Sequence, residues 1–343
     1  MNRTAFLDAP RRFRVADRPT PAAGPGEVLV KTTATAVCHT DLSIYTGHHP
    51  GVRYPVVMGH ESTGVIEQVG ADVTRVKPGQ HIIINPAITC GHCDSCKRGA
   101  GNLCRNAGMF GREIEGSLSQ YVRLAAPYVH VLPPQLPLDT ATLIETLATV
   151  RHAQLRVGIA AGESVAVLGQ GTAGLLHTQL AALSGANPVI AVSRSRWKLD
   201  MASRRGAHHV VESAVENAAD EVRRLTGGAG ADVVVDAAGD AATLRSAIGM
   251  LRPGGRFCAF AVSHEHATGF SMFPLYFGEI SIIGSRALTP EDMERSIELV
   301  ASGKIDVSGF ISATYPLARA AEAFEEYEKN PGRILRIVID YEA

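Results

Sequence analysis

The chain contains 343 residues, which is longer than one ordinary domain, so we expect two domains. Hydrophobic residues make up 45% and charged residues 20% of the sequence, as in globular proteins, and the net charge of −1 provides no basic field for nucleic acid or an anionic membrane. Residues 1–15 have no apolar core of signal-peptide length and no later stretch is long enough to span a bilayer, so a cytoplasmic location is expected.

Short β-rich segments broken by glycine and proline fill the first part of the chain, with the clearest predicted strands within residues 26–37, 60–73 and 79–86. Alone, the dipeptide His60–Glu61 fits a packed core histidine beside a strand-edge charge as well as it fits a metal site. With the thiol of Cys38 in "AVCHTDLS", it offers the sulfur, nitrogen and oxygen ligands of a catalytic zinc site, which keeps one position open.

A second cysteine group follows, with the spacing C-x2-C-x2-C-x7-C. Its members are Cys90, Cys93, Cys96 and Cys104. Disulfides are not expected in a reducing compartment, and the spacing of the fourth cysteine disfavours an iron–sulfur cluster. Four thiolates so close in sequence can close a tetrahedron around Zn²⁺, so we predict a structural zinc site.

From about residue 150 the sequence alternates between apolar strand patterns and alanine-rich helical patterns. The six predicted strands lie within residues 164–169, 187–193, 207–212, 231–239, 255–262 and 279–285. Near-continuous apolar strands joined by helices indicate a parallel sheet covered on both faces, the doubly wound α/β fold. The tail returns to a helix from residue 290 and a final strand within residues 333–341.

The first strand of this sheet leads into Gly169, Gly171 and Gly174, in the G-x-G-x-x-G spacing. In a strand–turn–helix context these glycines permit a tight turn, backbone approach to a pyrophosphate and close packing of helix on strand. A tight β–α turn without a ligand is the alternative interpretation. The context favours a dinucleotide-binding loop.

The end of the second strand bears on the choice of cofactor. NAD-binding sites of this kind carry an acidic residue there, but no acid occurs between Glu163 and Asp200. The chain has Ser193, Arg194 and Arg196 instead, which suit the 2′-phosphate of NADP(H). A solvated basic helix start is the alternative, and NADP(H) is favoured over NAD(H).

In this order, "CHTD", "GHE", the four cysteines and the glycine loop resemble the zinc-containing medium-chain alcohol dehydrogenase family over essentially the whole chain. The resemblance implies a β-rich GroES-like catalytic domain with a structural zinc lobe, formed by residues 1–147 and 286–343, and a Rossmann domain over residues 148–285. It also implies an enzyme with one catalytic and one structural Zn²⁺ per subunit, which interconverts an alcohol and its aldehyde or ketone with NAD(P).

The resemblance assigns Cys38 and His60 as zinc ligands, and Glu61 as the family glutamate that either coordinates zinc or sits behind it. Asp41 is similar to the acid that orients the ligating histidine. Glu145 stands where simple alcohol dehydrogenases have a cysteine, as in the threonine, sorbitol and butanediol dehydrogenase branch. That branch continues with proline, which Thr146 replaces here.

The same resemblance suggests a proton relay, in which zinc lowers the pKa of the alcohol and Thr40 passes the proton to the cofactor ribose. Many relatives have a histidine three residues further on, but this chain has Ser43. The end of the relay therefore stays open between Ser43, His39, His48, His49 and water.

Two further residues resemble cofactor contacts of the family: Thr149, which packs against the nicotinamide, and Arg336, which reaches the pyrophosphate. His264 and His266 follow the fifth strand, where the loop of this fold faces the nicotinamide, and are weaker pocket candidates.

Three rival interpretations remain: a zinc-free quinone or enoyl reductase of the same superfamily, a non-enzymatic crystallin-like relative and a zinc-binding nucleic-acid module. A zinc-free reductase would lack the combination of Cys38, His60 and Glu61, and a crystallin-like relative would not need intact zinc ligands. A nucleic-acid module would require a basic face, which the net charge of −1 disfavours. Glu145 favours a secondary alcohol, diol, polyol or hydroxy amino acid as the small-molecule substrate. The resemblance implies a homo-oligomer, a tetramer or a dimer.

Overall fold

The computed structural model describes residues 1–239, 241–262 and 271–342, and the chain divides into two compact units. The first unit comprises Met1–Thr146, Leu288–Ser302 and Val307–Ala343, and the second comprises Leu147–Ala287 and Gly303–Asp306. Among the described residues, no helix is long and apolar enough to cross a membrane.

The first unit is built on a mostly antiparallel sheet. Within the described residues this sheet has seven strands in the order β16-β17-β3-β4-β5-β9, with β8 also paired to β3. These strands are β3 (Glu27–Val37), β4 (Glu61–Val69), β5 (His81–Ile84), β8 (Tyr121–Ala125), β9 (Val129–Val131), β16 (Ile311–Pro316) and β17 (Arg336–Asp340). Smaller two-stranded sheets join β1 (Asn2–Ala9) to β2 (Arg12–Arg18) and β6 (Ala87–Ile88) to β7 (Gly108–Met109). The C-terminal strand therefore completes a sheet that the N-terminal part begins.

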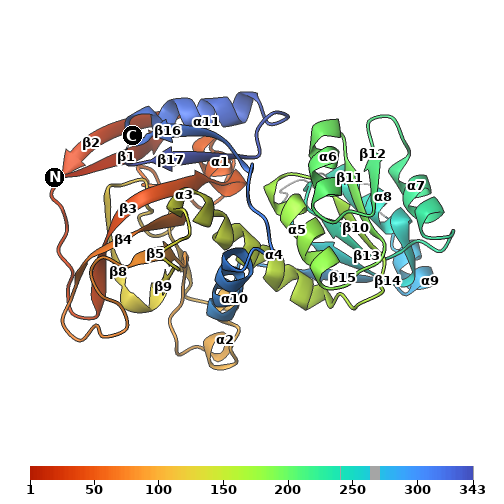
Figure 1. Cartoon of the computed structure of the whole chain (residues 1–343), viewed down its shortest axis with the longest axis horizontal. Coiled ribbons are helices and arrows are strands. Elements are labelled where there is room, and N and C mark those ends of the chain that lie inside the picture. Colours follow the sequence, from red (N-terminus) through yellow and green to blue (C-terminus); the bar gives the residue numbers. More distant parts are fainter. Residues whose placement is uncertain (240, 263–270, 343) are drawn as a thin grey trace. The chain divides into compact units, whose positions relative to one another are not determined.

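Helices of the first unit lie between and after these strands. They are α1 (His39–Tyr45), α2 (Asp94–Lys97), α3 (Leu138–Ala141), α10 (Pro290–Ala301) and α11 (Ala320–Lys329), with the 3₁₀ turns η1 (Gly101–Leu103), η2 (Ala126–Tyr128) and η3 (Leu317–Arg319). The unit boundary at Thr146 falls inside α4 (Leu143–Val157). Phe324 of α11 packs with Tyr45 of α1 and with Ile337 of β17, so the C-terminal helix covers the sheet beside α1, as Figure 1 shows.

Strand register brings three distant segments of the first unit together. In the antiparallel β3–β4 pair Ala36 lies opposite Glu61, and in the antiparallel β17–β3 pair Ile337 lies opposite Val37. Because paired antiparallel strands run in opposite directions, the end of β3 lies beside the starts of β4 and β17. Cys38, His60 and Arg336 therefore meet at one end of the neighbouring strands β17, β3 and β4.

The second unit contains a parallel sheet that, within the described residues, has six strands in the order β12-β11-β10-β13-β14-β15. Its strands are β10 (Val165–Leu168), β11 (Val189–Ser193), β12 (His209–Glu212), β13 (Ala231–Asp236), β14 (Leu251–Ala259) and β15 (Ser281–Gly284). Its helices after α4 are α5 (Thr172–Leu183), α6 (Arg196–Arg204), α7 (Ala218–Leu225), α8 (Ala241–Met250) and α9 (Phe273–Gly278). Numbered within this unit, the strand order is 3-2-1-4-5-6, the doubly wound arrangement that binds dinucleotides.

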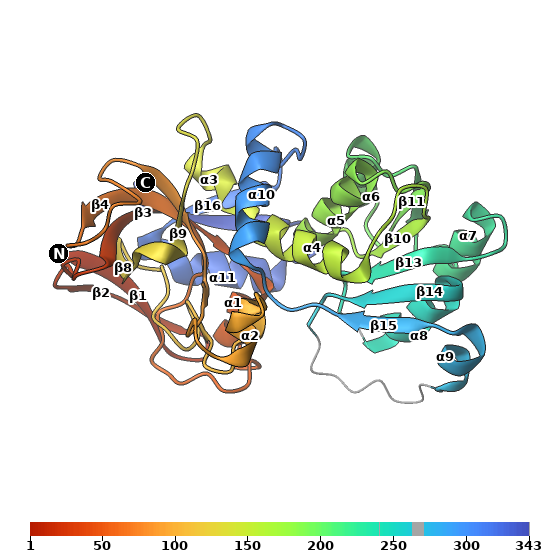
Figure 2. The same ribbon diagram turned by 90° about the horizontal axis from the view of Figure 1, so that it is seen from below.

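Both faces of this sheet are covered, which explains why its central strands are mostly apolar on both faces. Val165 and Val167 of β10 pack in one core cluster with Ala181 of α5, while Ala166 and Leu168 pack in another with residues of α7 and α8. Figure 2 shows α5 and α6 on one face of the sheet and α8 on the other. The predicted fold class, a Rossmann-type parallel sheet with a β-rich GroES-like domain, is confirmed.

Candidate functional site

The end of β3 and the start of β4, which lie side by side in the first unit, hold a buried group of three side chains that can bind a metal ion. Ligand atoms of Cys38, His60 and Glu61 all lie within 4.8 Å of one another. His60 is 3% and Glu61 1% exposed, and Cys38 is half-buried. Since Cys38 caps the N-terminus of α1 and His60 directly precedes β4, the strand register described above is what brings them together.

Asp41 ties the two ligand-bearing segments together. Its buried carboxylate accepts hydrogen bonds from the backbone N–H of Cys38 at 3.0 Å and of Gly59 at 3.3 Å, and lies 3.2 Å from Nδ1 of His60. A carboxylate can only accept, so Nδ1 carries the proton and the lone pair of Nε2 stays available to a metal ion. In the metal-free site burial lowers the pKa of His60, but the charge of Asp41, its hydrogen bond and the neighbouring Cys38 outweigh this and raise that pKa well above its usual value, so a metal ion that binds Nε2 displaces a proton from it.

Glu61 is held by a hydroxyl and a guanidinium. Thr146 donates a hydrogen bond to Oε1 at 2.9 Å, and Nη1 of Arg336 lies 3.2 Å from Oε2. Among the described residues Oε2 has no hydrogen-bond partner of good geometry, which leaves a buried carboxylate oxygen to serve a cation. A thiolate, an imidazole nitrogen and this oxygen form the donor set of a catalytic zinc site, so the residues present fit the ion.

Glu145 is a second buried carboxyl beside this group, at 5% exposure in the first turn of α4. Burial and the charge of Glu61 raise the pKa of Glu145 to about 8. Such a carboxyl needs a nearby cation to be ionised at neutral pH, and a metal ion supplies one. Its position therefore agrees with a place at the zinc site, while its direct ligation stays a prediction.

Helix α1 carries the candidate relay residues directly after Cys38. Thr40 and Ser43 are half-buried, and the exposed His39 contacts the hydroxyl of Tyr327 through Nδ1 at 3.1 Å. Tyr327, on α11, is buried, and its burial raises its pKa to about 12. Sequence reasoning did not select Tyr327, because no motif near it in sequence indicates that α11 packs on α1.

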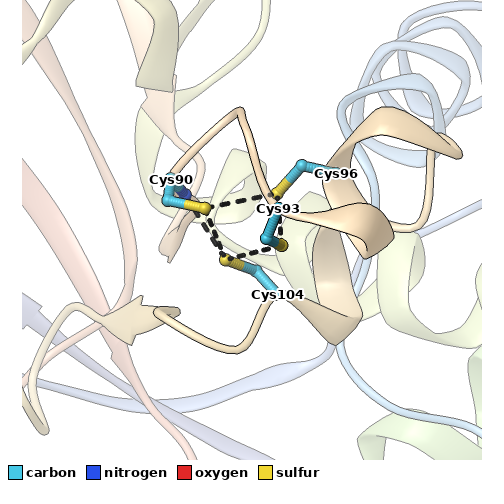
Figure 3. Close-up of side chains that lie close together, drawn as sticks. All are labelled: Cys90, Cys93, Cys96 and Cys104. Atoms are coloured by element: carbon cyan, nitrogen blue, oxygen red, sulfur yellow. Dashed lines mark hydrogen bonds between the residues drawn. The ribbon is translucent and has the colours of Figure 1, made fainter.

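The four cysteines of the predicted lobe converge, as Figure 3 shows. Their sulfur–sulfur distances are 3.5 Å for Cys93–Cys96 and for Cys90–Cys104, 3.8 Å for Cys93–Cys104 and 4.0 Å for Cys90–Cys96. A tetrahedron with zinc–sulfur bonds of about 2.3 Å has edges of about 3.8 Å, so the sulfurs already stand at the spacing that a zinc ion requires.

Ionisation within the lobe is uneven. Backbone N–H groups of Cys96 and Arg105 donate to the sulfur of Cys93 and lower its pKa to about 6. Partial loss of solvent and neighbouring sulfurs raise the pKa of Cys96 to about 11. Thiolates so close together repel one another, and a divalent cation removes that repulsion.

Each glycine of the loop between β10 and α5 has the position that a phosphate-binding turn needs. Gly169 has φ +82°, which side chains rarely adopt, and a Cβ at Gly174 would overlap the carbonyl oxygen of Gly169. A Cβ at Gly171 would project into open space, so the backbone there is approachable by a ligand at the helix N-terminus. Gln170, missed in the sequence, braces the loop through Val167 O at 3.0 Å and Thr178 at 3.0 Å.

The end of β11 carries the residues predicted to select the cofactor. Ser193 is buried and its hydroxyl accepts a hydrogen bond from the backbone of Ser195, while Arg194 is exposed. Arg196 starts α6 and pairs with Asp200 at 3.0 Å. The acidic residue that NAD-binding sites of this kind carry at the end of the second strand is absent here, as the sequence already shows.

The remaining predicted cofactor residues have different settings. Thr149 is half-buried in the part of α4 that belongs to the second unit. Arg336 is 3% exposed, and its guanidinium contacts Val37, Glu61 and Thr146 within the first unit. Its contact with a pyrophosphate stays a prediction. His264 and His266 lie outside the described residues.

Two family models match the chain: "Alcohol dehydrogenase GroES-like domain" over residues 24–134 and "Zinc-binding dehydrogenase" over residues 173–302. The sorbitol dehydrogenase of Bacillus subtilis is 28% identical over 341 residues, covering 98% of this chain and 96% of its own. The D-xylulose reductase A of Aspergillus oryzae is 32% identical over 340 residues, covering 96% and 95%. A solved Escherichia coli oxidoreductase of unknown specificity is 26% identical and covers 99% of both chains with a TM-score of 0.94.

Identity at this level over nearly the whole chain shows that it belongs to the zinc-containing medium-chain alcohol dehydrogenase family. Within that family the protein is a zinc-dependent alcohol or polyol dehydrogenase of class EC 1.1.1.-, with NAD(P) as its nucleotide cofactor. The rival interpretations without zinc catalysis are thereby set aside.

Proposed function

We propose that the protein interconverts a secondary alcohol group of a vicinal diol or polyol and the corresponding ketone by hydride transfer with NADP(H). The observation that carries this proposal is the convergence of Cys38, His60 and Glu61 at one buried point, with the carboxyl of Glu145 beside them. The catalytic ion is one of two zinc ions that we propose per subunit. The other belongs to the four-cysteine lobe.

When bound, zinc supplies Lewis acidity that polarises the substrate oxygen and lowers the pKa of an alcohol. The chain would hold the ion through the thiolate of Cys38 and Nε2 of His60, and Asp41 keeps the imidazole in the required tautomer. Thr40 lies on α1, two residues after Cys38, and we assign its hydroxyl the role of accepting the proton of the substrate alcohol and passing it on. Ser43 and His39 share that helix and are the candidate next members of the relay.

Two features support a polyol or diol substrate. A carboxylate at Glu145 replaces the thiolate of simple alcohol dehydrogenases, which makes the site richer in hydrogen-bond acceptors for neighbouring hydroxyl groups. The named relatives at about 30% identity include a sorbitol dehydrogenase and a D-xylulose reductase, both named for sugar-derived compounds. The screen that tests this compares diols, polyols, hydroxy acids and aromatic alcohols as hydride donors. Faster turnover of simple aromatic alcohols than of every polyol contradicts the proposal.

The preference for NADP(H) rests on Arg194. Its exposed guanidinium at the end of β11 is free of the ion pair that engages Arg196 with Asp200, and a 2′-phosphate is a matching anion. We expect Arg194→Asp to lower kcat/KM for NADP⁺ and to raise it for NAD⁺, changing the ratio by roughly 10-fold or more. Arg204→Asp, an exposed arginine at the other end of α6, is the control. An unchanged ratio in Arg194→Asp removes the argument.

The relay assignment is tested at Thr40. We expect Thr40→Val to lower kcat by on the order of 10²-fold, the usual contribution of a positioned proton-transfer group, while zinc content stays at the wild-type value. Thr40→Ser restores the hydroxyl and should recover most of the rate. Near-wild-type turnover in Thr40→Val shows that the proton leaves by another route.

We also propose that the protein is a cytoplasmic homo-oligomer, a dimer or a tetramer. Phe273 and Phe277 stack at 5.4 Å on the outer side of α9 and are 64% and 75% exposed. Nearby β15 is an edge strand of the described sheet, with Ile282 45% exposed. Exposed apolar groups beside an open strand edge are typical of a surface that a partner covers. A monomer by light scattering at micromolar concentration contradicts this part.

A further inference from the structure

The carboxylate of Glu61 is embedded in a polar cluster that the sequence did not reveal. Glu61 starts β4, Thr146 lies in the first turn of α4 and Arg336 starts β17, so the three come from widely separated parts of the chain. Their exposures are 1%, 6% and 3%, and buried polar groups of this kind are costly unless they satisfy one another.

The direction of each hydrogen bond in the cluster follows from the chemistry of the groups. Nη2 of Arg336 lies 2.8 Å from Oγ1 of Thr146, and a guanidinium can only donate, so the hydroxyl oxygen accepts there. The single hydroxyl proton of Thr146 is then directed at Oε1 of Glu61, 2.9 Å away. Arg336 thus fixes the hydroxyl, and the hydroxyl fixes one oxygen of the carboxylate.

Arg336 also reaches the strand that ends at Cys38. Its Nη1 donates to the carbonyl oxygen of Val37 at 3.0 Å and lies 3.2 Å from Oε2 of Glu61. One side chain therefore holds both the residue before the thiol ligand and the carboxylate of the third member of the metal group. Arg336 is an ion-pair neighbour of Oε2 and not a hydrogen-bond donor to it, and among the described residues Oε2 has no hydrogen-bond partner, so it is the oxygen that stays available to a metal ion.

We propose that Thr146 and Arg336 are positioning residues that hold Glu61 in the catalytic zinc site: Thr146 engages Oε1, while Arg336 orients the Thr146 hydroxyl and lies beside Oε2, the oxygen that faces the ion. A proline at position 146, which the sorbitol and threonine dehydrogenase branch carries, has no hydroxyl and can form neither the bond to Glu61 nor the bond from Arg336. The arrangement is therefore a property of this chain, and it links the departure at Thr146 to the affinity of the site for metal. The proposal rests on the assignment of Cys38, His60 and Glu61 to that site.

The decisive variant is Thr146→Val, which keeps the shape of the side chain and removes the hydroxyl. Groups that orient a metal ligand usually contribute 10- to 100-fold in metal affinity, so we expect roughly 10-fold weaker zinc binding at the catalytic site. Zinc retained by the full-length protein is measured by elemental analysis after equilibration with a graded series of chelator concentrations. The four-cysteine lobe, in the same molecule, is the internal reference and should keep its ion at the wild-type chelator concentration.

Three comparisons separate positioning from simple damage to the fold. Thr146→Ser restores a hydroxyl and should recover wild-type zinc retention. Thr142→Val removes an equally buried hydroxyl, which donates to Asp139 O at 2.6 Å and does not contact Glu61, and should leave zinc retention unchanged. Added free zinc should restore the kcat of Thr146→Val, whereas a misfolded variant does not recover.

Cobalt substitution provides a spectroscopic reading of the same cluster. Replacing Arg336 by lysine keeps the charge but cannot contact Val37, Glu61 and Thr146 together. We expect Arg336→Lys and Thr146→Val each to shift the visible absorption of Co²⁺ at the catalytic site, and the double variant to weaken metal binding by less than the product of the two effects, because both act through one carboxylate.

The outcomes are distinguishable from failure of the proposed function. If the wild-type protein holds a single zinc ion, retained by the cysteine lobe alone, the zinc chemistry itself is wrong. If the wild type holds two ions and Thr146→Val releases the catalytic ion at the wild-type chelator concentration or only at a higher one, the positioning role is overturned and the proposed function stands.

Discussion

The four-cysteine lobe takes all its ligands from residues 90–104, whereas the site at Cys38 draws its candidate ligands from the end of β3, the start of β4 and the start of α4. The lobe is built of sulfur alone, and only Cys104 among its ligands is buried. The catalytic group is chemically mixed, and His60 and Glu61 are almost fully buried.

This difference fits the two tasks. Four thiolates in a short loop close the coordination sphere of an ion and stabilise a segment that has little apolar core of its own. A thiolate at the end of β3 and an imidazole and a carboxylate at the start of β4 are three unlike ligands that leave a coordination position open, and the sheet fixes the two strands that carry them. Loss of the lobe is therefore expected to affect local order, and loss of the catalytic group to affect chemistry.

The largest effect is expected for His60→Ala. Lewis-acid stabilisation contributes several kcal/mol, and each 1.4 kcal/mol is a factor of ten, so kcat should fall on the order of 10³-fold. Zinc content should drop from two ions to one per subunit. His209→Ala, an exposed histidine of β12, is the matched control and should keep both rate and zinc. Wild-type kcat in His60→Ala would falsify zinc-assisted chemistry at this site.

A smaller effect is expected for Asp41→Asn. An asparagine has one acceptor oxygen in place of two, so it cannot serve Cys38, Gly59 and His60 as Asp41 does. We expect zinc affinity at the catalytic site to fall 10- to 100-fold while the lobe keeps its ion. Chelator titration followed by elemental analysis measures both sites in one sample. Equal release from both sites shows that the variant has damaged the fold of the unit and not the orientation of one ligand.

The contrast between the two sites also explains what the sequence could predict. The lobe and the glycine loop are local: their residues lie within 15 positions or fewer, and their spacing alone indicates the geometry that Figure 3 and the turn at Gly169 display. The six strands of the second unit were predicted for a similar reason, because burial on both faces leaves an apolar pattern in each of them. One detail differs: β14 begins at Leu251 and not within the predicted residues 255–262, because Leu251 pairs with Ala231 before the register shifts.

The surroundings of Glu61 could not be predicted in this way. Thr146 is 85 residues and Arg336 275 residues away in sequence, and their contacts depend on β17 pairing with β3 and on α4 starting beside these strand ends. Neither residue type indicates such a partner, because threonine and arginine side chains are both mostly exposed in folded proteins. The contact of His39 with Tyr327 was missed for the same reason, since it depends on α11 packing against α1.

The smallest effect on turnover is expected for Cys104→Ser, which tests whether the two sites are independent. Serine is a poor zinc ligand, so the lobe should lose its ion and zinc content should fall to one ion per subunit. The remaining ion should be the one bound by Cys38 and His60. Because the ligands of the lobe all lie within residues 90–104, the damage should be confined to that segment, and limited proteolysis should cleave there sooner than in the wild type. At low temperature, before the segment unfolds further, kcat should stay within a few-fold of the wild-type value. A loss of turnover as large as that of His60→Ala, with the catalytic ion still bound, means that the lobe shapes the active site directly, and the division of labour argued from the ligand sets is then wrong.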